Sequence, residues 1–433
     1  MSSAPGRMDG LHITGVLALA FFLIIGAHYV FKASCGSMLV ERYGPSGVPM
    51  ADLLEAVLAI GVVIPVLSSS RLRVRLSAIL GVAAALAVFI LSLAPMVPRQ
   101  AQAYDFALFA TFLAGGLLIS LSNYSVWMLL TATVEQRTGL HVTVFGAGAQ
   151  VAMILASFGV EKLLDYTTPA KLLWLVAVGY AAAWAILLAG VRRFRCVAGR
   201  STEFAALALR NRDAIGLTGV LTVLRSPYLR LLCLVIIAHI TFGQAMRWRV
   251  YEQASASDTV SGAAAMLTVF YRYSGFAALG AQLILLPLAF RFVKVQRGLF
   301  IQPAIGILSL ALLLQSTSPE AIFASIAVFT SVDYTINKAM SEVLYIPLPI
   351  HVKVQVKSVI AMLVPKLGAM IASALILSFG ADRLDLWAGT LCAVAVVWTA
   401  AAALALQYYR KIQSNVTLER YESIDAVAVD APR

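Results

Sequence analysis

The stretch LHITGVLALAFFLIIGAHYVFKASCGSML, residues 11–39, contains a single Lys or Arg, Lys32, and no acidic residue. An α-helix needs about 20 predominantly apolar residues to cross the hydrocarbon core of a bilayer. This stretch is longer than that, and it lacks the short apolar core and small-residue cleavage site of a secretory signal peptide. It therefore predicts a first membrane-spanning helix that is retained in the protein.

Similar apolar runs recur along the whole chain. They lie at about 11–39, 48–69, 76–97, 104–133, 142–162, 170–191, 228–248, 261–290, 298–316, 320–341, 356–380 and 385–408. In lipid, only helices and closed barrels satisfy every backbone polar group, and barrel strands would be shorter and would alternate in polarity. The sequence therefore predicts an all-α integral membrane protein with about twelve transmembrane helices.

The overall composition agrees with a membrane protein. Only 12% of the 433 residues are charged, whereas roughly a quarter are charged in a soluble protein. This excludes a soluble enzyme, a disordered protein and a disulfide scaffold. The cysteines have no metal-ligand spacing, and the common motifs of hydrolases, metalloproteases and phosphate-binding loops are missing. We therefore expect no enzymatic activity, no cofactor and no metal, although a polytopic membrane enzyme or assembly factor stays open as a third interpretation.

The runs are divided into two sets of six by a polar linker that contains seven arginines. Basic residues are densest on the segments that share a side with both termini, which predicts cytoplasmic termini by the positive-inside rule. The net charge of +12 is explained by topology and anionic lipid headgroups, without a nucleic acid. The expected organisation is a six-helix bundle at 1–191, a basic linker at 192–227, a second six-helix bundle at 228–408 and a cytoplasmic tail at 409–433.

Several features recur at equivalent positions of the two sets. RLRVR at 71–75 and RFVKVQR at 291–297 each lie between the second and third spans of a set, and His28 and His239 lie at similar depth in the first spans. Together with the division into six and six, this resembles the architecture of major facilitator transporters, whose two halves enclose a site near the midplane.

Ionisable groups within membrane spans are costly and indicate function by default. Here basic groups outnumber acidic ones, and buried cations need a counter-charge that an anionic solute could supply. The interior and edge groups are Lys32, Asp52, Glu55, Arg272, Asp333, Lys338, Lys366, His28, His239, Arg247, Arg249, Glu342 and Lys357.

Several of these groups also have purely structural explanations. Lys338 and Glu342 are four positions apart on one helix face, which favours an ion pair at an inner gate over direct substrate contact. Lys32 could extend to the outer surface instead of into the protein. His28 and His239 could carry protons, with Asp52 or Asp333 as partners, or could simply form hydrogen bonds between helices.

The stretch DYTINKAMSEVLYIPLPIHVKVQVKSVIAMLVPKLGAMIASA, residues 333–374, resembles the tenth and eleventh spans of the plastid and bacterial ATP/ADP translocase family. Residues 28–32, 145–157 with Trp127, and 226–230 with Trp248 are similar to further spans of that family. The resemblance implies a twelve-helix fold and exchange of nucleotides across a membrane. It also implies that Lys357 matches a lysine needed for transport and that Lys32 belongs to a basic cluster of the first span.

The chain departs from that family where charges are expected. Cys35, Gly36, Gly115, Ala245 and Ala361 stand at positions where the family has charged residues. Loss of several charges at once indicates a distant relative that carries another phosphorylated or anionic metabolite.

We therefore expect a secondary transporter that works as an antiporter by alternating access, as a monomer in a bacterial inner membrane. The expected substrate contacts are Lys32, Lys357, Lys366, Arg272 and Arg247, with Tyr271 and Trp248 stacking on a base. Lys338 and Glu342 form the expected gate. The alternative is a proton-coupled major facilitator permease for an unrelated solute such as a siderophore, peptide or drug, with His28, His239, Asp52 and Asp333 as proton carriers.

Overall fold

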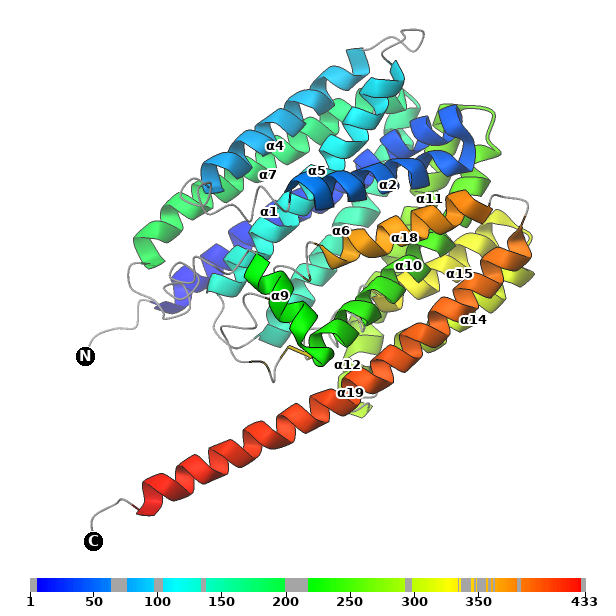
Figure 1. The fold of residues 1–433 in the computed structure, drawn as a ribbon. Coiled ribbons are helices and arrows are strands. Elements are labelled where there is room, and N and C mark those ends of the chain that lie inside the picture. The colour runs from blue at the N-terminus through cyan, green and yellow to red at the C-terminus, as the bar shows by residue number, and fades with distance from the viewer. Residues whose placement is uncertain are drawn as a thin grey trace.

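The computed structural model describes residues 6–63, 76–96, 104–133, 138–198, 217–292, 298–333, 335, 344–345, 348, 356, 360, 363–379 and 383–429. Over these residues the protein is built of helices, with no strand among them (Figure 1). All statements below concern this part of the chain.

The first half of the chain forms one set of helices. They are α1 (Gly6–Tyr43), η1 (Gly44–Ser46), α2 (Gly47–Leu58), η2 (Ala59–Val63), α4 (Leu76–Leu93), η4 (Ala94–Met96), α5 (Tyr104–Thr133), α6 (Thr138–Leu164) and α7 (Pro169–Ala198). Within this set α1 packs against α5, α6 and α7, and α4 packs against α5 and α7.

The second half forms the other set. Its helices are α9 (Leu217–Arg225), α10 (Pro227–Ser255), α11 (Val260–Gly280), η5 (Ala281–Leu285), α12 (Leu286–Phe292), α14 (Ile301–Gln315), α15 (Pro319–Val332), α18 (Val364–Phe379) and α19 (Leu384–Val429). Here α10 packs against α11, α15, α18 and α19.

Length and composition agree with the predicted membrane spans. Among the described residues, six segments are long and apolar enough to cross a membrane, and the first of these, Gly15–Gly61, begins within α1 and includes α2. Shorter apolar helices lie in α4, α5, α14, α15 and α18. Large apolar side chains such as Phe89, Phe106 and Val178 are exposed on the outside of the bundle, where lipid would cover them. The predicted all-α membrane fold is thus confirmed.

Two helices extend beyond the boundaries that hydropathy predicts. The sixth span was expected to end near 191, whereas α7 continues to Ala198, and the last span was expected to end near 408, whereas α19 continues to Val429. In Figure 1 the end of α19 projects away from the other helices. The difference arises because hydropathy marks where apolar residues stop, and a polar helix can continue into water.

Local sequence explains where several helices begin. Ser226 and Ser318 each precede a proline and accept a hydrogen bond from a backbone N–H three residues later, at 3.4 and 3.3 Å, and Thr259 does the same for α11 at 3.0 Å. These are N-cap residues, and proline is favoured at the first helical position because it has no N–H to leave unsatisfied. Gly44 has φ of 66°, a left-handed conformation that allows the sharp turn between α1 and α2.

Contacts between the two sets are made by a few helices. α2 packs against α18, α6 packs against α11, and α1 packs against α10 and α11. Figure 1 shows α18 lying beside α2, although they come from opposite ends of the chain. Functional groups on these helices therefore lie where the two halves meet.

Candidate functional site

The contact between α2 and α18 contains an ion pair that joins the two halves. Lys366 Nζ of α18 donates to Glu55 Oε1 of α2. The lysine side chain is 21% exposed and the glutamate side chain 14%. Both charges are therefore largely removed from solvent, where an opposite charge close by is needed to offset the cost of burial.

The Glu55 carboxylate lies against α5 where two glycines follow each other. A Cβ atom at Gly116 would collide with the Glu55 carboxylate, and one at Gly115 would collide with the Phe31 ring. The two glycines therefore leave room for a carboxylate and a ring to lie directly on the α5 backbone. Any larger residue at position 116 would push the Glu55 carboxylate away.

The position of Lys366 is fixed by close packing of α18 against α10. A Cβ at Gly368 would lie 2.8 Å from Ile240 Cβ and 3.0 Å from the Ile237 carbonyl oxygen. In addition, the Thr241 hydroxyl donates to the Gly368 carbonyl oxygen at 3.1 Å. Lys366 therefore moves with α10 as part of the second half.

Further charged side chains surround this pair. Lys32 of α1 interacts electrostatically with Arg247, Asp52, Glu55 and Lys366. Asp52 of α2 interacts with the same set of groups. We call these five residues the central charge cluster: Lys32, Asp52, Glu55, Arg247 and Lys366.

The cluster is divided unequally between the halves. The first half contributes two acids and one base, and the second half contributes two bases, Arg247 and Lys366. The two faces therefore attract each other, and three bases against two acids leave one net positive charge. A site of this kind inside a membrane protein suits an anionic ligand.

Two uncharged polar groups near the cluster have no hydrogen-bond partner among the described residues. They are His28 Nδ1 and the Tyr180 hydroxyl, and both atoms are buried. His28 interacts electrostatically with Lys32, Arg247 and Lys366, and Tyr180 with Glu55. Because an unsatisfied buried polar atom is costly, these two are groups that a ligand could satisfy.

Arg272 lies outside the cluster, although it was expected to contact substrate. On α11 it forms an ion pair with Glu161 of α6, and its guanidinium carbon lies 4.9 Å from the centre of the Phe158 ring. Phe158 and Glu161 are three positions apart and so share one face of α6. The structure places Arg272 in a second contact between the halves.

His239 and Asp333 form a pair inside the second half. His239 Nε2 lies 2.8 Å from Asp333 Oδ1, and both side chains are largely buried. The imidazole packs against the rings of Phe329 and Trp398, with centroids 6.1 and 5.3 Å away. Of the four expected proton carriers, these two are brought together, whereas His28 and Asp52 belong to the surroundings of the central charge cluster.

The two aromatic residues expected to stack on a base are engaged with other rings. Tyr271 of α11 lies 5.1 Å from Tyr29 of α1, between the two halves. Trp248 is buried and its ring lies 6.1 Å from that of Trp387 on α19, inside the second half. Tyr271 is therefore the better placed of the two for contact with a ligand between the halves.

Three expected site residues, Lys338, Glu342 and Lys357, lie outside the described residues, and their roles stay predictions. Glu55 was expected as an interior ionisable group without a specific role, and no role was expected for Glu161 or Tyr180. The spacing of Glu55, three positions after Asp52 and so on the same helix face, could have assigned the two acids to one site.

Comparisons with known proteins inform the fold. No family model matches the sequence, and no curated protein matches it. The structure is similar to that of a POT family transporter in complex with 5-aminolevulinic acid, with 15% sequence identity, a TM-score of 0.57, and coverage of 92% of this chain and 96% of that chain. It is also similar to a peptide transporter POT in complex with sulfate, with 14% identity, a TM-score of 0.60, and coverage of 92% and 95%.

A third similar structure is a bacterial homologue of the iron transporter ferroportin in an outward-facing state with soaked iron. The identity is 14%, the TM-score is 0.58, and the match covers 93% of this chain and 99% of that chain. At these identities the likeness establishes the fold, which is the major-facilitator-like fold that the sequence predicts. None of the three is described as a nucleotide translocase, so the resemblance to that family stays a prediction.

Proposed function

We propose that the protein is a secondary transporter that carries a small anionic solute across a membrane by alternating access. In this mechanism the two halves rock about a site near the midplane, so that it opens to one side at a time. The fold shared with solved transporters supports the mechanism but leaves the solute open.

The central charge cluster is the observation on which this proposal rests. Charged side chains within a membrane are rare and usually line the path of a substrate or ion. Here Lys32 comes from one half and Arg247 and Lys366 from the other. A solute held by all three would contact both halves, so its binding would change their relative stability in the two orientations.

Nucleotides and other phosphorylated metabolites are the favoured solutes. Phosphate oxygens form strong charge-assisted hydrogen bonds with Lys and Arg. The resemblance of 333–374 to nucleotide exchangers supports the same class and adds Lys357 as a further contact. We further propose that the protein exchanges one solute for another. It would do so as a monomer in a bacterial inner membrane, with both termini in the cytoplasm.

Counterflow in proteoliposomes tests the proposal. Vesicles are preloaded with unlabelled ADP, inorganic phosphate or glucose 6-phosphate and then receive labelled ATP, phosphate or glucose 6-phosphate outside. Accumulation of at least one labelled anion that requires the preload is expected for the native protein and not for Lys366→Gln. Arg42→Gln, which alters an exposed pair outside the cluster, serves as the control and should transport normally. Failure of every anion to accumulate would overturn the proposal.

A second candidate is a proton-coupled permease for a solute of another class, such as a peptide. The His239–Asp333 pair favours it, because a histidine in contact with a carboxylate inside a membrane bundle is the kind of pair from which proton relays of transporters are built. Uptake that collapses with a protonophore, is lost in Asp333→Asn and ignores internal counter-solute would support this candidate over exchange.

A further inference from the structure

Lys366 has a counter-ion before any solute arrives. The Glu55 carboxylate accepts a hydrogen bond from its ammonium across the contact between α2 and α18. An anion that binds Lys366 must therefore compete with a carboxylate that is attached to the protein and lies against α5 in the space left by Gly116. Binding of an anion to the Lys366 ammonium therefore requires that the ammonium release the Glu55 carboxylate.

The groups around Glu55 determine what happens when it is released. Its own helix contributes Asp52, α1 contributes Lys32, α10 contributes Arg247 and α18 contributes Lys366. Tyr180 of α7 interacts electrostatically with Glu55, and His28 of α1 interacts with Lys32, Lys366 and Arg247. The α5 backbone contacts it at Gly116, which adds no side chain.

The charge balance of this set depends on the ligand. Without a ligand the central charge cluster has one net positive charge, because three bases face two acids. A singly charged anion would neutralise it, whereas a doubly charged anion such as a phosphate monoester would leave one net negative charge. In a site shielded from water such an excess is costly, and a carboxylate that has just lost its partner can remove it by binding a proton.

We propose that Glu55 is a tethered competitor for Lys366, so that a doubly charged anion binds the central charge cluster together with one proton that Glu55 takes up. This inference rests on the proposed function, and it adds the coupling ion and the group that carries it. It differs from coupling through His239 and Asp333, because that pair lies within one half and does not compete with a ligand between the halves.

The test measures binding of sulfate, which stays doubly charged across neutral pH, so that any pH dependence belongs to the protein. Purified native protein in detergent is titrated with sulfate by calorimetry at three pH values between 6 and 8. Linkage to one proton predicts that the apparent affinity falls by about tenfold for each unit of rising pH. In Glu55→Gln, which has no competing carboxylate and cannot take up the proton, sulfate should bind more tightly and the tenfold fall per unit of rising pH should be lost, whereas Asp52→Asn should keep that fall.

Two variants serve as controls. Lys366→Gln should not bind sulfate at any pH, and Asp105→Asn, the matched change of an exposed acid to its amide, should bind as the native protein does. Sulfate affinity that is unaltered by Glu55→Gln would overturn the competition. A pH dependence that persists in Glu55→Gln but vanishes in His28→Gln would assign the proton to the histidine and overturn the role of Glu55.

These results are independent of transport. If no anion accumulates in counterflow while sulfate binds as expected, the proposed function fails and the linkage at Glu55 holds. If anions accumulate but sulfate binding to the native protein is independent of pH, transport holds and the linkage fails. Absence of sulfate binding to both the native protein and Glu55→Gln would overturn the competition at Lys366.

Discussion

Within the part of the chain that the structure describes, the ion pairs Glu55–Lys366 and Glu161–Arg272 each join the two halves, and they differ in their surroundings. Glu55 and Lys366 are 14% and 21% exposed and lie among three further charged residues. The side chains of Glu161 and Arg272 are 42% and 22% exposed, and the Arg272 guanidinium carbon lies 4.9 Å from the centre of the Phe158 ring. In each pair an acid of the first half meets a base of the second.

The comparison indicates that an acid–base ion pair between the halves can take part in ligand binding at one contact and can hold the halves together at another. Exposed pairs are screened by solvent and contribute little, whereas removing one partner of a buried pair leaves an uncompensated charge. Glu55 and Lys366 both interact electrostatically with Lys32 and Asp52, as does Arg247, so a ligand at this contact would have other charged groups within its reach. The proposed function therefore places solute binding at the α2–α18 contact and leaves the α6–α11 contact to hold the halves together.

Lys366→Gln is expected to have the largest effect. It leaves the Glu55 carboxylate buried without its direct partner, which costs about 3 kcal/mol, at the lower end for buried pairs because Lys32 remains nearby. Thermal unfolding in detergent measures the loss, and counterflow should be abolished. An unchanged melting temperature would show that Glu55 and Lys366 are not paired in the purified protein.

Gly368→Ala tests whether Lys366 is held rigidly against α10. The added Cβ would meet Ile240 and the Ile237 backbone, and overpacking of this kind costs about 1–3 kcal/mol. Gly148→Ala is the matched control, because nothing lies within 4 Å of the Cβ that it would add. Equal melting temperatures of the two variants would contradict the close packing of α18 on α10.

Glu161→Gln tests the α6–α11 ion pair, whose acid is the more exposed of the two. Because Glu161 is partly exposed and Arg272 keeps its contact with Phe158, the loss of stability should be about 1 kcal/mol or less. Transport by this variant should retain the solute preference of the native protein. A change in which anions are transported would place the α6–α11 contact in the binding site.

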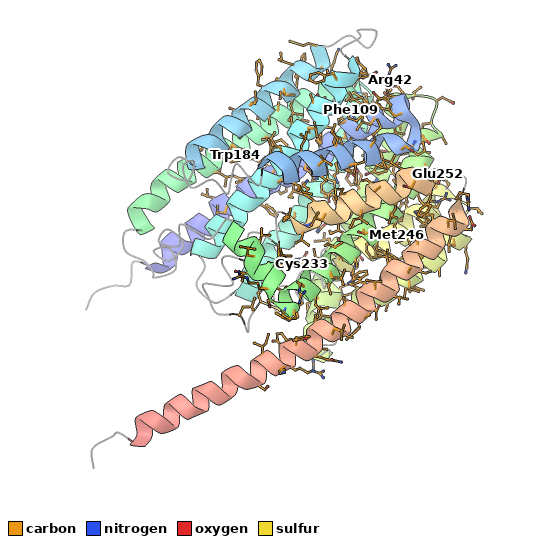
Figure 2. All side chains as sticks on the ribbon, viewed as in Figure 1. Arg42, Phe109, Trp184, Cys233, Met246 and Glu252 are labelled. Carbon is orange, nitrogen blue, oxygen red and sulfur yellow. The ribbon has the colours of Figure 1, made fainter. Side chains whose placement is uncertain are left out.

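Arg42→Gln is expected to have the smallest effect. Arg42 lies at one end of the bundle, as does Glu252 (Figure 2), and it donates to Asp105 at 2.9 and 3.2 Å within the first half. The two side chains are 51% and 45% exposed, so water replaces the lost contact. Melting temperature and counterflow should both match those of the native protein.

The sequence predicts much of the fold because a bilayer imposes long apolar runs. It also predicts the members of the central charge cluster, since ionisable residues stand out against apolar neighbours. Lys32, Asp52, Glu55, Arg247 and Lys366 were all identified in this way. Lys32 had a second interpretation at the outer surface, and its interactions with the other cluster members favour the interior one.

The pairing of these groups could not be predicted. Glu55 and Lys366 are 311 positions apart, and periodicity shows which face of a helix a residue occupies but not which helix it meets. For the same reason Arg272 was assigned to substrate, although Glu161 on α6 is its partner.

Gly115 illustrates a different limit of sequence reasoning. Within the resemblance to nucleotide translocases it counts as a lost charge. In the structure it leaves room for the Phe31 ring, and the neighbouring Gly116 leaves room for the Glu55 carboxylate. An acid is thus present at this place in the fold, but α2 supplies it.

The double variant Glu55→Gln/Lys366→Gln tests the central claim most directly. Replacing both partners by amides removes the unpaired buried charge, so stability should recover relative to Lys366→Gln alone. The measurement is counterflow of the anions named above with this folded variant. We expect that no anion accumulates, because the ammonium that binds the solute is gone. Transport at the native rate would contradict it, since Lys366 would then serve only to neutralise Glu55.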